Sequence, residues 1–522
     1  MVTKRIVVLA TVVGSTVIAL VLTFWPRKTH RPAPPVVTVT AVEAPGAPTV
    51  AATADAGVPR GIARVAVRVR DPAGRVLPAR LTFVGIGGTV TPAFTRADVG
   101  IDQPGGVLAY DRAFIGGEAT LDVPAGRYEL WITHGMEWEV ASRIIEARHG
   151  ETATVDVTLT HVVDTPNWIS GDFHVHAERS PDSHVLMRHR VLQFAADGVD
   201  VLVATDHNAI ADYAPVIAEL GLTEQVASIR GDEVTTHDWG HFGAFPLAPD
   251  DGSPGSRPPA VAGRTPAEIF ADLRARSSQT VIDVHHPRLE AGRIGYFHLG
   301  QLDTATLRSL RPGFSFDFDA VEVLNGYQDP DRHSVDAVLA DWFSFLRRGR
   351  RVTATGNSDT HHLTFNLGGY PRNYVQMSGR DPVELARAVK AGRSFFTTGP
   401  IVEVSVGDKG LGDTVAAQRG QLQLHVIVKA PSWIDVDRVS VLVDGVVVLE
   451  RATAGAPPLR FDETLAIPIK RDTFVVVRVD GDKPMAPMIG DGAKFQVFPL
   501  AITNPIWVDF DGDGAVTPSI AD

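Results

Sequence analysis

The chain has 522 residues, of which 44% are hydrophobic and 21% charged, and its formal net charge is −12. This length predicts about three domains, and the composition is that of globular protein rather than of a disordered chain. The negative charge argues against a general nucleic-acid binder. Because the chain has no cysteine, disulfides, thiolate metal sites and a thiol nucleophile are excluded. Histidine is concentrated instead, since 13 of the 18 histidines fall between residues 171 and 362.

The N-terminal segment, residues 1–30, predicts a transmembrane helix. Two basic residues precede about twenty uncharged, mostly apolar residues from Ile6 to Trp25, and two more basic residues follow them. That length spans a bilayer core as a helix, and Trp-Pro-Arg-Lys is unlike a signal-peptide cleavage site. We therefore expect an uncleaved membrane anchor, with the catalytic part extracytoplasmic, in the periplasm. A cleaved signal peptide and the opposite orientation remain open alternatives.

In the rest of the chain, the composition and the pattern of apolar and polar residues change at recognisable points. Residues 31–60 are rich in Pro, Ala, Thr and Val, which predicts an extended linker. Apolar and polar residues alternate over 61–163 between turns such as Asp-Pro-Ala-Gly, which predicts a β-sandwich. Over 164–400, apolar strand-like runs alternate with helical stretches, which indicates a parallel sheet or barrel. Residues 401–500 predict a second β-sandwich-like domain, and residues 501–522 a tail with an Asp-rich turn.

Imidazole and carboxylate side chains follow successive strand-like runs of the α/β part. In parallel α/β architectures, the carboxyl ends of the strands converge on the functional site. Imidazole and carboxylate are ligands for Zn²⁺, Mn²⁺ or Fe²⁺, so the joint pattern predicts a multinuclear metal centre. The strand ends carry His174 and His176, Asp206 and His207, Glu233 and His241, His285 and His286, Glu322 and Asn325, and Asp359 and His361.

Two positions in this series indicate how such a centre is built. His174 and His176 are spaced by one residue, and residues i and i+2 of a strand point to the same face, so both rings aim at one point. A carboxylate such as Glu233 could bridge two ions, and a shared water would then ionise near neutral pH. Each motif alone is a weak signal, because Asp and Asn also favour helix caps and turns.

The order of the motifs resembles a known superfamily. The His-x-His, TDHN, GDE, HHP and SDTHH motifs resemble the polymerase-and-histidinol-phosphatase (PHP) superfamily over roughly 165–400. The flanking β domain and the SFFTTGP stretch at 394–400 resemble the CehA/McbA group of metallohydrolases within it. The resemblance implies a distorted (β/α)7 PHP-type barrel, flanked by the two β-sandwich-like domains, that holds two or three divalent ions such as Mn, Zn or Fe.

The resemblance also implies roles for individual residues. His174 and His176 would bind one ion, with Glu233 bridging and Asp359 completing the site. His286, directly before a proline, matches the His-Pro of the family, whereas His285 would lie behind the ligands or in the core. The remaining implied ligands of the further ion or ions are His207, Asp182, His361 and His241.

The chain departs from the family pattern at two places. It has SPDSH where Ser-Asp-Gly is common, so His184 competes with Asp182 for the ligand role. It has Glu322 and Asn325 where some relatives have histidine, so one metal site is expected to be weaker or absent.

We therefore expect a metal-dependent hydrolase in which a metal-activated hydroxide attacks an ester-type substrate. The substrate is a small-molecule phosphoester, or a carbamate, carboxylic ester or amide. Asp359 would act at the metals, Asp206 would orient ligands and move protons, and Arg288 would clamp an anionic group or form a structural ion pair. The alternative is a membrane-tethered binding protein with a metal-stabilised, inactive barrel.

The C-terminal turn raises a separate question. Asp509, Asp511 and Asp513 have the spacing that begins a calcium loop, but position twelve of that loop is Ile520 instead of a glutamate. An EF-hand is excluded, and a partial calcium site or a solvated turn remains.

Overall fold

The architecture comes from a computed structural model of the chain. It describes residues 7–13, 16–22, 61–95, 99–252, 256–289, 294–326, 333–364, 367–417, 420–490 and 496–517. The predicted linker over 31–60 and the end of the predicted tail, residues 518–522, lie outside these ranges. The chain forms two compact units, Met1–Ala56 and Gly57–Asp522.

The first unit contains two antiparallel strands, β1 (Val7–Val13) and β2 (Thr16–Leu22), in register from Val7 opposite Leu22 to Val13 opposite Thr16. The predicted transmembrane helix is therefore wrong for these residues. Most of them are β-branched, and β-branched residues favour extended backbone over helix. In the described ranges, no helix is long and apolar enough to cross a membrane.

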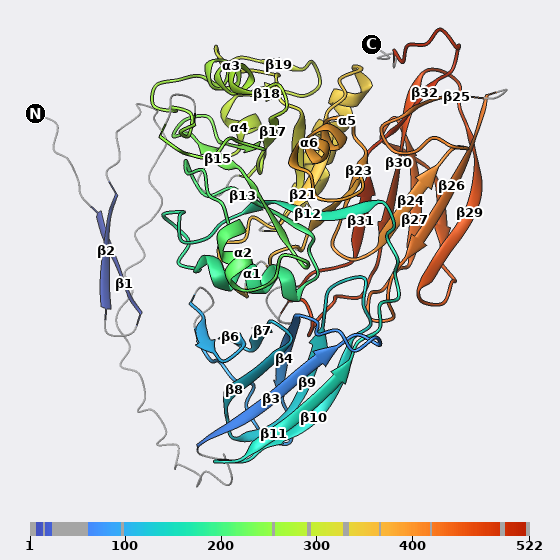
Figure 1. The fold of residues 1–522 in the computed structure, drawn as a ribbon. Helices are drawn as coiled ribbons and strands as arrows, with labels where there is room; N and C mark the ends of the chain where they lie inside the picture. The colour runs from blue at the N-terminus through green and yellow to red at the C-terminus, as the bar shows by residue number, and fades with distance from the viewer. Residues whose placement is uncertain are drawn as a thin grey trace, which may run out of the picture. The chain divides into compact units, whose positions relative to one another are not determined.

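Residues 61–163 form two sheets that share one core, in the strand orders β11-β3-β8 and β10-β9-β4-β7-β6-β5 (Figure 1). β3 alternates exposed and buried residues along its length, as the sequence pattern predicts, and Val65 and Val67 point into the core with Leu81 and Phe83 of β4. The strands are β3 (Ile62–Arg70), β4 (Ala79–Gly85), β5 (Ile101–Gln103), β6 (Gly106–Ala109), β7 (Arg112–Ile115), β8 (Glu118–Pro124), β9 (Gly126–Thr133), β10 (Ala141–Ala147) and β11 (Thr152–Thr158).

The next part alternates strands and helices. Its strands are β12 (Trp168–Val175), β13 (Val201–Ala204), β14 (Ala227–Arg230), β15 (Asp232–Thr235), β16 (His241–Phe245), β17 (Val281–Val284), β18 (Leu302–Asp303), β19 (Arg308–Ser309), β20 (Ala320–Asn325), β21 (Thr353–Asn357), β22 (Arg372–Gln376) and β23 (Ser394–Thr397). Its helices are α1 (Met187–Ala196), α2 (Ala214–Glu219), α3 (Pro266–Arg276), α4 (Tyr296–Leu299), α5 (His333–Arg347) and α6 (Pro382–Lys390).

Local signals explain several of these elements. β13, β17 and β20 are buried throughout and pair in parallel with neighbours, as their continuous apolar runs predict. α3 begins at a capping box, in which Thr265 accepts from the Glu268 backbone and Glu268 accepts from the Thr265 backbone. α6 begins at Asp381, whose carboxylate accepts two backbone N–H groups of the first turn.

The strands of this part do not close into one barrel among the described residues. Apart from the short antiparallel pair β18-β19, they belong to two sheets, one in the order β14-β13-β12-β22-β23 and the other in the order β15-β16-β17-β20-β21. The chain crosses between the sheets at Gly231, where a Cβ atom would meet Val203 at 2.9 Å, and β21 pairs with β20 alone. The expected distorted (β/α)7 barrel is therefore not closed, and its two sheets meet at a seam beside β21, where Val175 pairs with Thr360.

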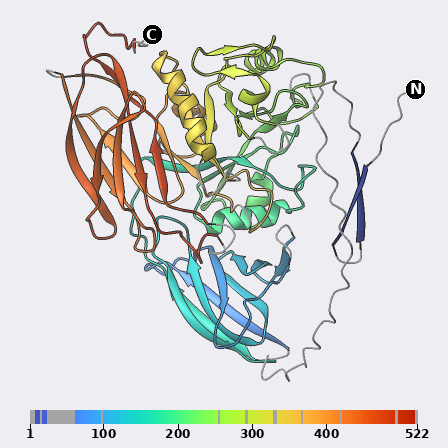
Figure 2. The same cartoon turned by 180° about the vertical axis from the view of Figure 1, so that it is seen from behind.

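Most of the C-terminal strands extend the sheet that contains β23, whereas β24, β26 and β29 form a separate three-stranded sheet. β23 pairs with β31, and the strand order continues β31-β30-β27-β28 (Figures 1 and 2). Residues 501–509 were expected in a tail, but they belong to two buried strands because each apolar side chain there packs in a core. The strands are β24 (Ile401–Ser405), β25 (Thr414–Ala416), β26 (Gln421–Lys429), β27 (Arg438–Val443), β28 (Val446–Ala452), β29 (Leu459–Pro468), β30 (Thr473–Asp480), β31 (Leu500–Thr503) and β32 (Ile506–Asp509).

Candidate metal centre

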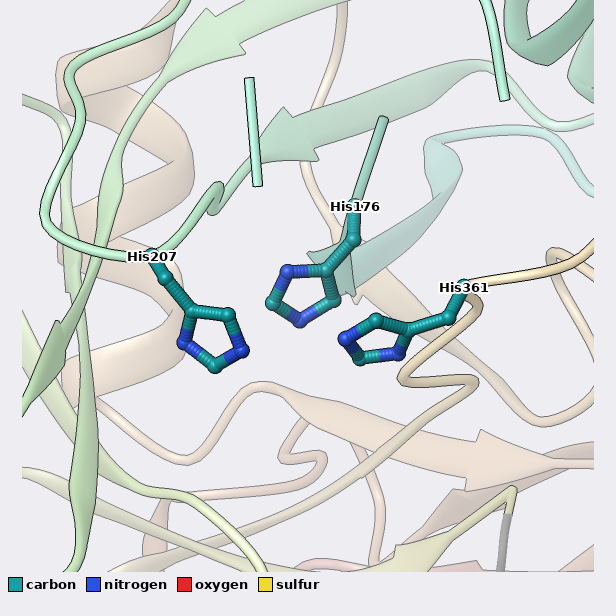
Figure 3. Close-up of side chains that lie close together, drawn as sticks. All are labelled: His176, His207 and His361. Carbon is teal, nitrogen blue, oxygen red and sulfur yellow. The ribbon is translucent and has the colours of Figure 1, made fainter. Parts of the chain in front are cut away.

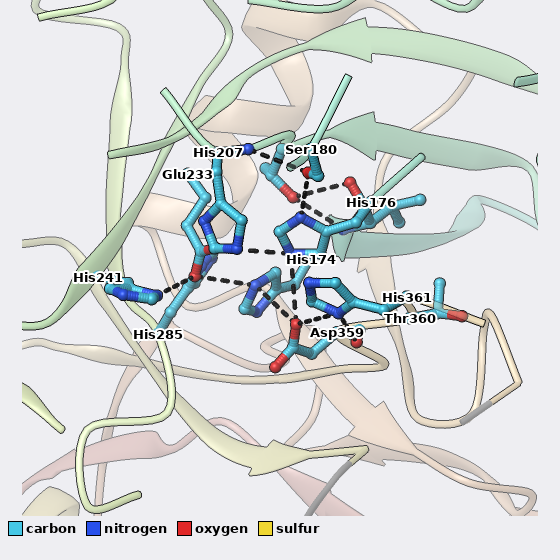
Figure 4. Close-up of polar contacts among 12 residues, drawn as sticks. His174, His176, Ser180, His207, Glu233, His241, His285, Asp359, Thr360 and His361 are labelled. Carbon is cyan, nitrogen blue, oxygen red and sulfur yellow. Dashed lines mark hydrogen bonds and ion pairs between the residues drawn. The ribbon is translucent and has the colours of Figure 1, made fainter. Parts of the chain in front are cut away.

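The end of β12 brings two histidines into the interior. His174 is the next-to-last residue of the strand, and His176 comes directly after its end. Both rings are fully buried, and their centroids lie 5.0 Å apart. Their Nε2 atoms are directed toward two carboxylates, Glu233 and Asp359 (Figure 4). The structure therefore brings the His-x-His motif to one point, as the spacing predicts.

Glu233, in β15, lies at the centre of the cluster and is fully buried. Its Oε2 atom lies 2.7 Å from Nδ1 of His207 and 3.5 Å from Nε2 of His176. Its Oε1 atom lies within 3.2 Å of one ring nitrogen of each of four histidines, and these are His174, His241, His285 and His286. A carboxylate with different histidines on its two oxygens has the arrangement of a bridge between ions.

Asp359 contacts the same Nε2 atom of His174 as Glu233 does. Its Oδ1 atom lies 3.2 Å from Nε2 of His174, 3.3 Å from Nε2 of His176 and 3.4 Å from Nδ1 of His361. Its backbone φ is 52°, a left-handed conformation that aspartate tolerates better than most residues. This turn follows β21 directly and directs the carboxylate inward.

One side of the cluster reaches solvent. The rings of His176, His207 and His361 face one another there (Figure 3), and His176 stacks on His361 with centroids 3.9 Å apart. Asp182 lies beside them with a side chain that is 54% exposed, and its two oxygens lie 3.1 Å from Nε2 of His207 and 3.4 Å from Nε2 of His361. His184, the competing candidate, is exposed.

These side chains fit divalent ions. In each of four groups of three residues, one ligand atom per residue lies within 4.8 Å of the others. Within the described part of the chain, Nε2 of His174, Nε2 of His176 and Oε2 of Glu233 are buried and form no hydrogen bond of good geometry, although each lies within 3.5 Å of a polar atom of the cluster. Nitrogen and carboxylate ligands suit Zn²⁺, Mn²⁺ or Fe²⁺. The groups are His176, His207 and His361; His174, Glu233 and His286; His174, His176 and Asp359; and His207, Glu233 and His241.

The electrostatics of the cluster favour cations. Burial alone would raise the pKa of Glu233, but the charges of His174, His207 and His241 lower it well below its usual range. Burial alone would lower the pKa of His207, but Glu233 and Asp182 raise it to about 10. Burial and the nearby His174 lower the pKa of His285 to about 4. The carboxylates therefore stay ionised inside the protein, balanced by protonated imidazole rings such as that of His207, which would release a proton when an ion binds.

Glu322, from β20, supports His174 from behind. Its Oε1 atom lies 2.9 Å from Nδ1 of His174, and its Oε2 atom accepts hydrogen bonds from the backbone N–H of His286 and the side chain of Asn325. Asn325 also donates to Oδ2 of Asp359 at 3.0 Å. Glu322 and Asn325 thus orient ligands. Glu322 holds Nδ1 of His174 and leaves its Nε2 free to coordinate, and Asn325 holds the Asp359 carboxylate.

Asp206 acts on the cluster through a serine that the sequence analysis did not identify. Nδ1 of His176 donates to Oγ of Ser180 at 2.8 Å, and Ser180 donates to Oδ1 of Asp206 at 3.0 Å. Oδ2 of Asp206 accepts from the hydroxyl of Tyr213 at 3.1 Å. Asp206 therefore orients His176, and no motif in the sequence marks Ser180, which simply lies four residues after that histidine.

Three further predictions have defined places. Arg288 forms a two-point ion pair with Asp341 of α5, at 2.6 and 3.0 Å, which is the structural alternative for this residue. His285 stacks on His174 at 3.6 Å while also reaching Glu233. In the C-terminal turn, Asp509 lies with Asp472 and Asp511 in a group that could hold an ion, and its oxygens accept the backbone N–H groups of residues 512 and 514.

Comparison with known proteins gives distant likenesses. No protein-family model and no curated protein matches the chain. The crystal structure of the lesion-specific endonuclease PfuEndoQ from Pyrococcus furiosus is similar with 15% identity and a TM-score of 0.30 over 43% of this chain and 56% of the endonuclease. An engineered protein is similar with 12% identity and a TM-score of 0.14 over 62% of this chain and 81% of its own. The chain thus spans about half the length of the endonuclease, and TM-scores this low do not establish a shared fold.

Proposed function

We propose that the chain is a metal-dependent hydrolase of the PHP superfamily, in its CehA/McbA-like group, with two or three divalent ions such as Mn, Zn or Fe. One observation carries the proposal. Imidazole side chains from five separate segments between residues 174 and 361 surround the carboxylates of Glu233 and Asp359 at 2.7–3.5 Å. Solvated surface residues do not converge in this way, and an ordinary core does not bury this many titratable groups.

The ions would be held by His174, His176, His207, His241, His286, His361, Asp182, Glu233 and Asp359. Divalent ions bound there would supply Lewis acidity, which would ionise water near neutral pH and polarise the substrate oxygen. The chain itself fixes the rings: Glu322 and Ser180 each hold a proton on Nδ1, so that Nε2 of His174 and Nε2 of His176 face the carboxylates. Because Asp182 is the exposed member, we infer that substrate approaches from its side.

The proposed substrate is a small-molecule ester, either a phosphoester or a carbamate, carboxylic ester or amide. The chain offers no thiol nucleophile, since it has no cysteine. Arg288 is held by Asp341, so binding of an anionic group by this side chain would require that ion pair to open.

Metal content of the purified full chain tests the centre. After loading with manganese, zinc or iron, we expect two or more equivalents per chain by mass spectrometry. The double variant His174→Ala/His176→Ala should lose them. The matched control is His149→Ala/His425→Ala, which removes two exposed histidines that pair with Ile62 and Asp462, and it should retain them. Equal metal content in both double variants would contradict the proposal.

Hydrolysis tests the activity separately. The metal-loaded chain is assayed with phosphate monoesters and diesters, carbamates, carboxylic esters, amides and DNA. Turnover that is lost in Asp359→Asn while metal remains bound supports a hydrolase. A folded, metal-loaded chain that turns over none of these substrates favours the alternative, a binding protein with an inactive, metal-stabilised core.

A further inference from the structure

The strand that leads to Asp359 and His361 lies at the edge of its sheet. Among the described strands, β21 pairs with β20 on one side only. On its other side, the backbone N–H and C=O groups of alternate residues point toward the neighbouring sheet. These groups are fully buried, and buried backbone groups need partners. The residues concerned are Ala354, Gly356, Ser358 and Thr360.

Two asparagine side chains supply the first of these partners. Oδ1 of Asn504 accepts from the N–H of Ala354 at 2.8 Å, and its Nδ2 donates to the C=O of the same residue at 3.0 Å. Oδ1 of Asn373 accepts from the N–H of Gly356 at 3.0 Å, and its Nδ2 donates to that C=O at 3.0 Å. An amide side chain carries one acceptor and two donors, so each asparagine replaces one peptide group of a missing strand.

The same asparagines are attached to the other sheet. Nδ2 of Asn504 also donates to the backbone C=O of Ser394, in β23, at 3.0 Å. Nδ2 of Asn373 also contacts the C=O of Gly171, in β12, at 3.3 Å. Both amides therefore connect β21 with the sheet that carries the His-x-His motif, and both side chains are fully buried.

Farther along, the row of contacts reaches the metal centre. Oδ1 of Asp172 accepts from the N–H groups of Ser358, at 3.1 Å, and His174, at 3.2 Å. The backbone N–H of His176 then donates to the C=O of Thr360 at 3.2 Å. Asp359 lies between Ser358 and Thr360, which make these two contacts. Its position relative to His174 and His176 therefore depends on the contacts between β21 and the neighbouring sheet.

We propose that Asn504 and Asn373 are positioning residues that join the two sheets and thereby set the distance between the His-x-His motif and the Asp359–His361 motif. This inference rests on the metal centre of the proposed function. It makes the C-terminal strands a working part of that centre, because Asn504 lies between β31 and β32, 150 residues from Ala354 along the chain.

The substitution Asn504→Asp tests the role of the amide. Aspartate has the same shape and accepts from Ala354, but it cannot donate to the two carbonyl groups. The control is Thr503→Val at the neighbouring position in β31. It removes a buried hydrogen bond that the Thr503 hydroxyl accepts from the N–H of Val477 in β30. Both variants lose buried hydrogen bonds, two in Asn504→Asp and one in Thr503→Val, but only Asn504→Asp alters the seam. Asn504→Ser is the milder second variant if Asn504→Asp does not fold.

Two measurements on the full chain decide between positioning and stability alone. The first is manganese affinity by titration, with the electron paramagnetic resonance spectrum of the bound ions. We expect Asn504→Asp to bind manganese about tenfold more weakly and to change the spectrum. We expect the affinity of Thr503→Val to stay within about twofold of the parent. The second is hydrogen exchange of residues 353–361, which should accelerate in the asparagine variant alone.

The outcomes separate the two proposals. Unchanged exchange and affinity in the asparagine variant, or equal changes in the threonine control, would overturn the positioning role. A parent protein that binds no manganese, zinc or iron would refute the metal centre, and the positioning role with it. The exchange contrast would then show only whether the asparagines join the sheets.

Discussion

Glu322 accepts a hydrogen bond from Nδ1 of His174 at 2.9 Å, and this contact turns Nε2 of the ring toward Glu233 and Asp359. A carboxylate in this position fixes the tautomer and raises the basicity of the ligand nitrogen. Burial would raise the pKa of Glu322, but the charge of His174 and the hydrogen bond to it lower the pKa below its ordinary value. Glu322 therefore accepts this bond in its ionised form.

Replacing this carboxylate with the amide of the same shape should weaken metal binding. We expect Glu322→Gln to lower the affinity of the centre about tenfold, because a neutral amide is a poorer acceptor for the Nδ1 proton. Competition with a chelator measures the change. The control, Glu403→Gln, neutralises a carboxylate paired with Lys429 in β26 and should leave the affinity as it is. Equal affinity of both variants would refute the role of Glu322.

Ser180 links Asp206 to His176, so Ser180→Ala should loosen the His176 ring. We expect a loss of metal affinity of about tenfold, with the fold retained. Ser170→Ala is the control, since Ser170 also is a buried serine that donates to an aspartate, the half-buried Asp200, at 2.8 Å. Isothermal titration of both variants shows the difference, and a similar loss in the control would mean that the effect is one of stability.

The two sides of the cluster should differ in how many ions depend on them. Asp182 is exposed and contacts only His207 and His361 among the proposed ligands, whereas Glu233 is buried between six histidines. We expect Asp182→Asn to lose about one metal equivalent and Glu233→Gln to lose all of them. Mass spectrometry of the purified variants counts the ions. Full retention in Glu233→Gln would show that this carboxylate is not a bridge.

Strand-end chemistry was readable from the sequence because it depends on local rules. The period of two in β12 sets the directions of His174 and His176, and parallel pairing gathers the ends of β17, β20 and β21 at the same edge. Glu233 and His241 reach the cluster differently, because β15 and β16 pair antiparallel and His241 begins its strand. The histidines and acids singled out in this way do converge around Glu233 and Asp359 in the structure. Ser180 and Glu322 act as supports through contacts that depend on tertiary structure, and only the second is marked in the sequence as a strand-end residue.

The sheet arrangement was less predictable for equally physical reasons. An apolar run such as that of β1 and β2 satisfies the hydrophobic pattern of a membrane helix as well as that of strands, and only its β-branched content favours strands. The seam beside β21 depends on Asn373 and Asn504, which are distant in sequence and ordinary in local context. The pattern of apolar and polar residues over 501–522 does not distinguish short buried strands from a tail.

Stability should depend on pH through His134, which follows β9 and packs its ring against Trp138 at 5.1 Å. Burial lowers the pKa of His134 from 6.5 to about 4. Below about pH 6.5 the unfolded chain therefore binds a proton at His134, whereas the folded chain does not. The contribution of neutral His134 to the free energy of unfolding is present above pH 6.5 and is lost as the pH falls toward 4. The loss is about 2 kcal/mol by pH 5 and about 3 kcal/mol in full. Urea unfolding at pH 7.5 and pH 5 measures it, and His134→Gln should reduce the difference by that amount. A variant with the parent's full pH dependence would contradict this assignment.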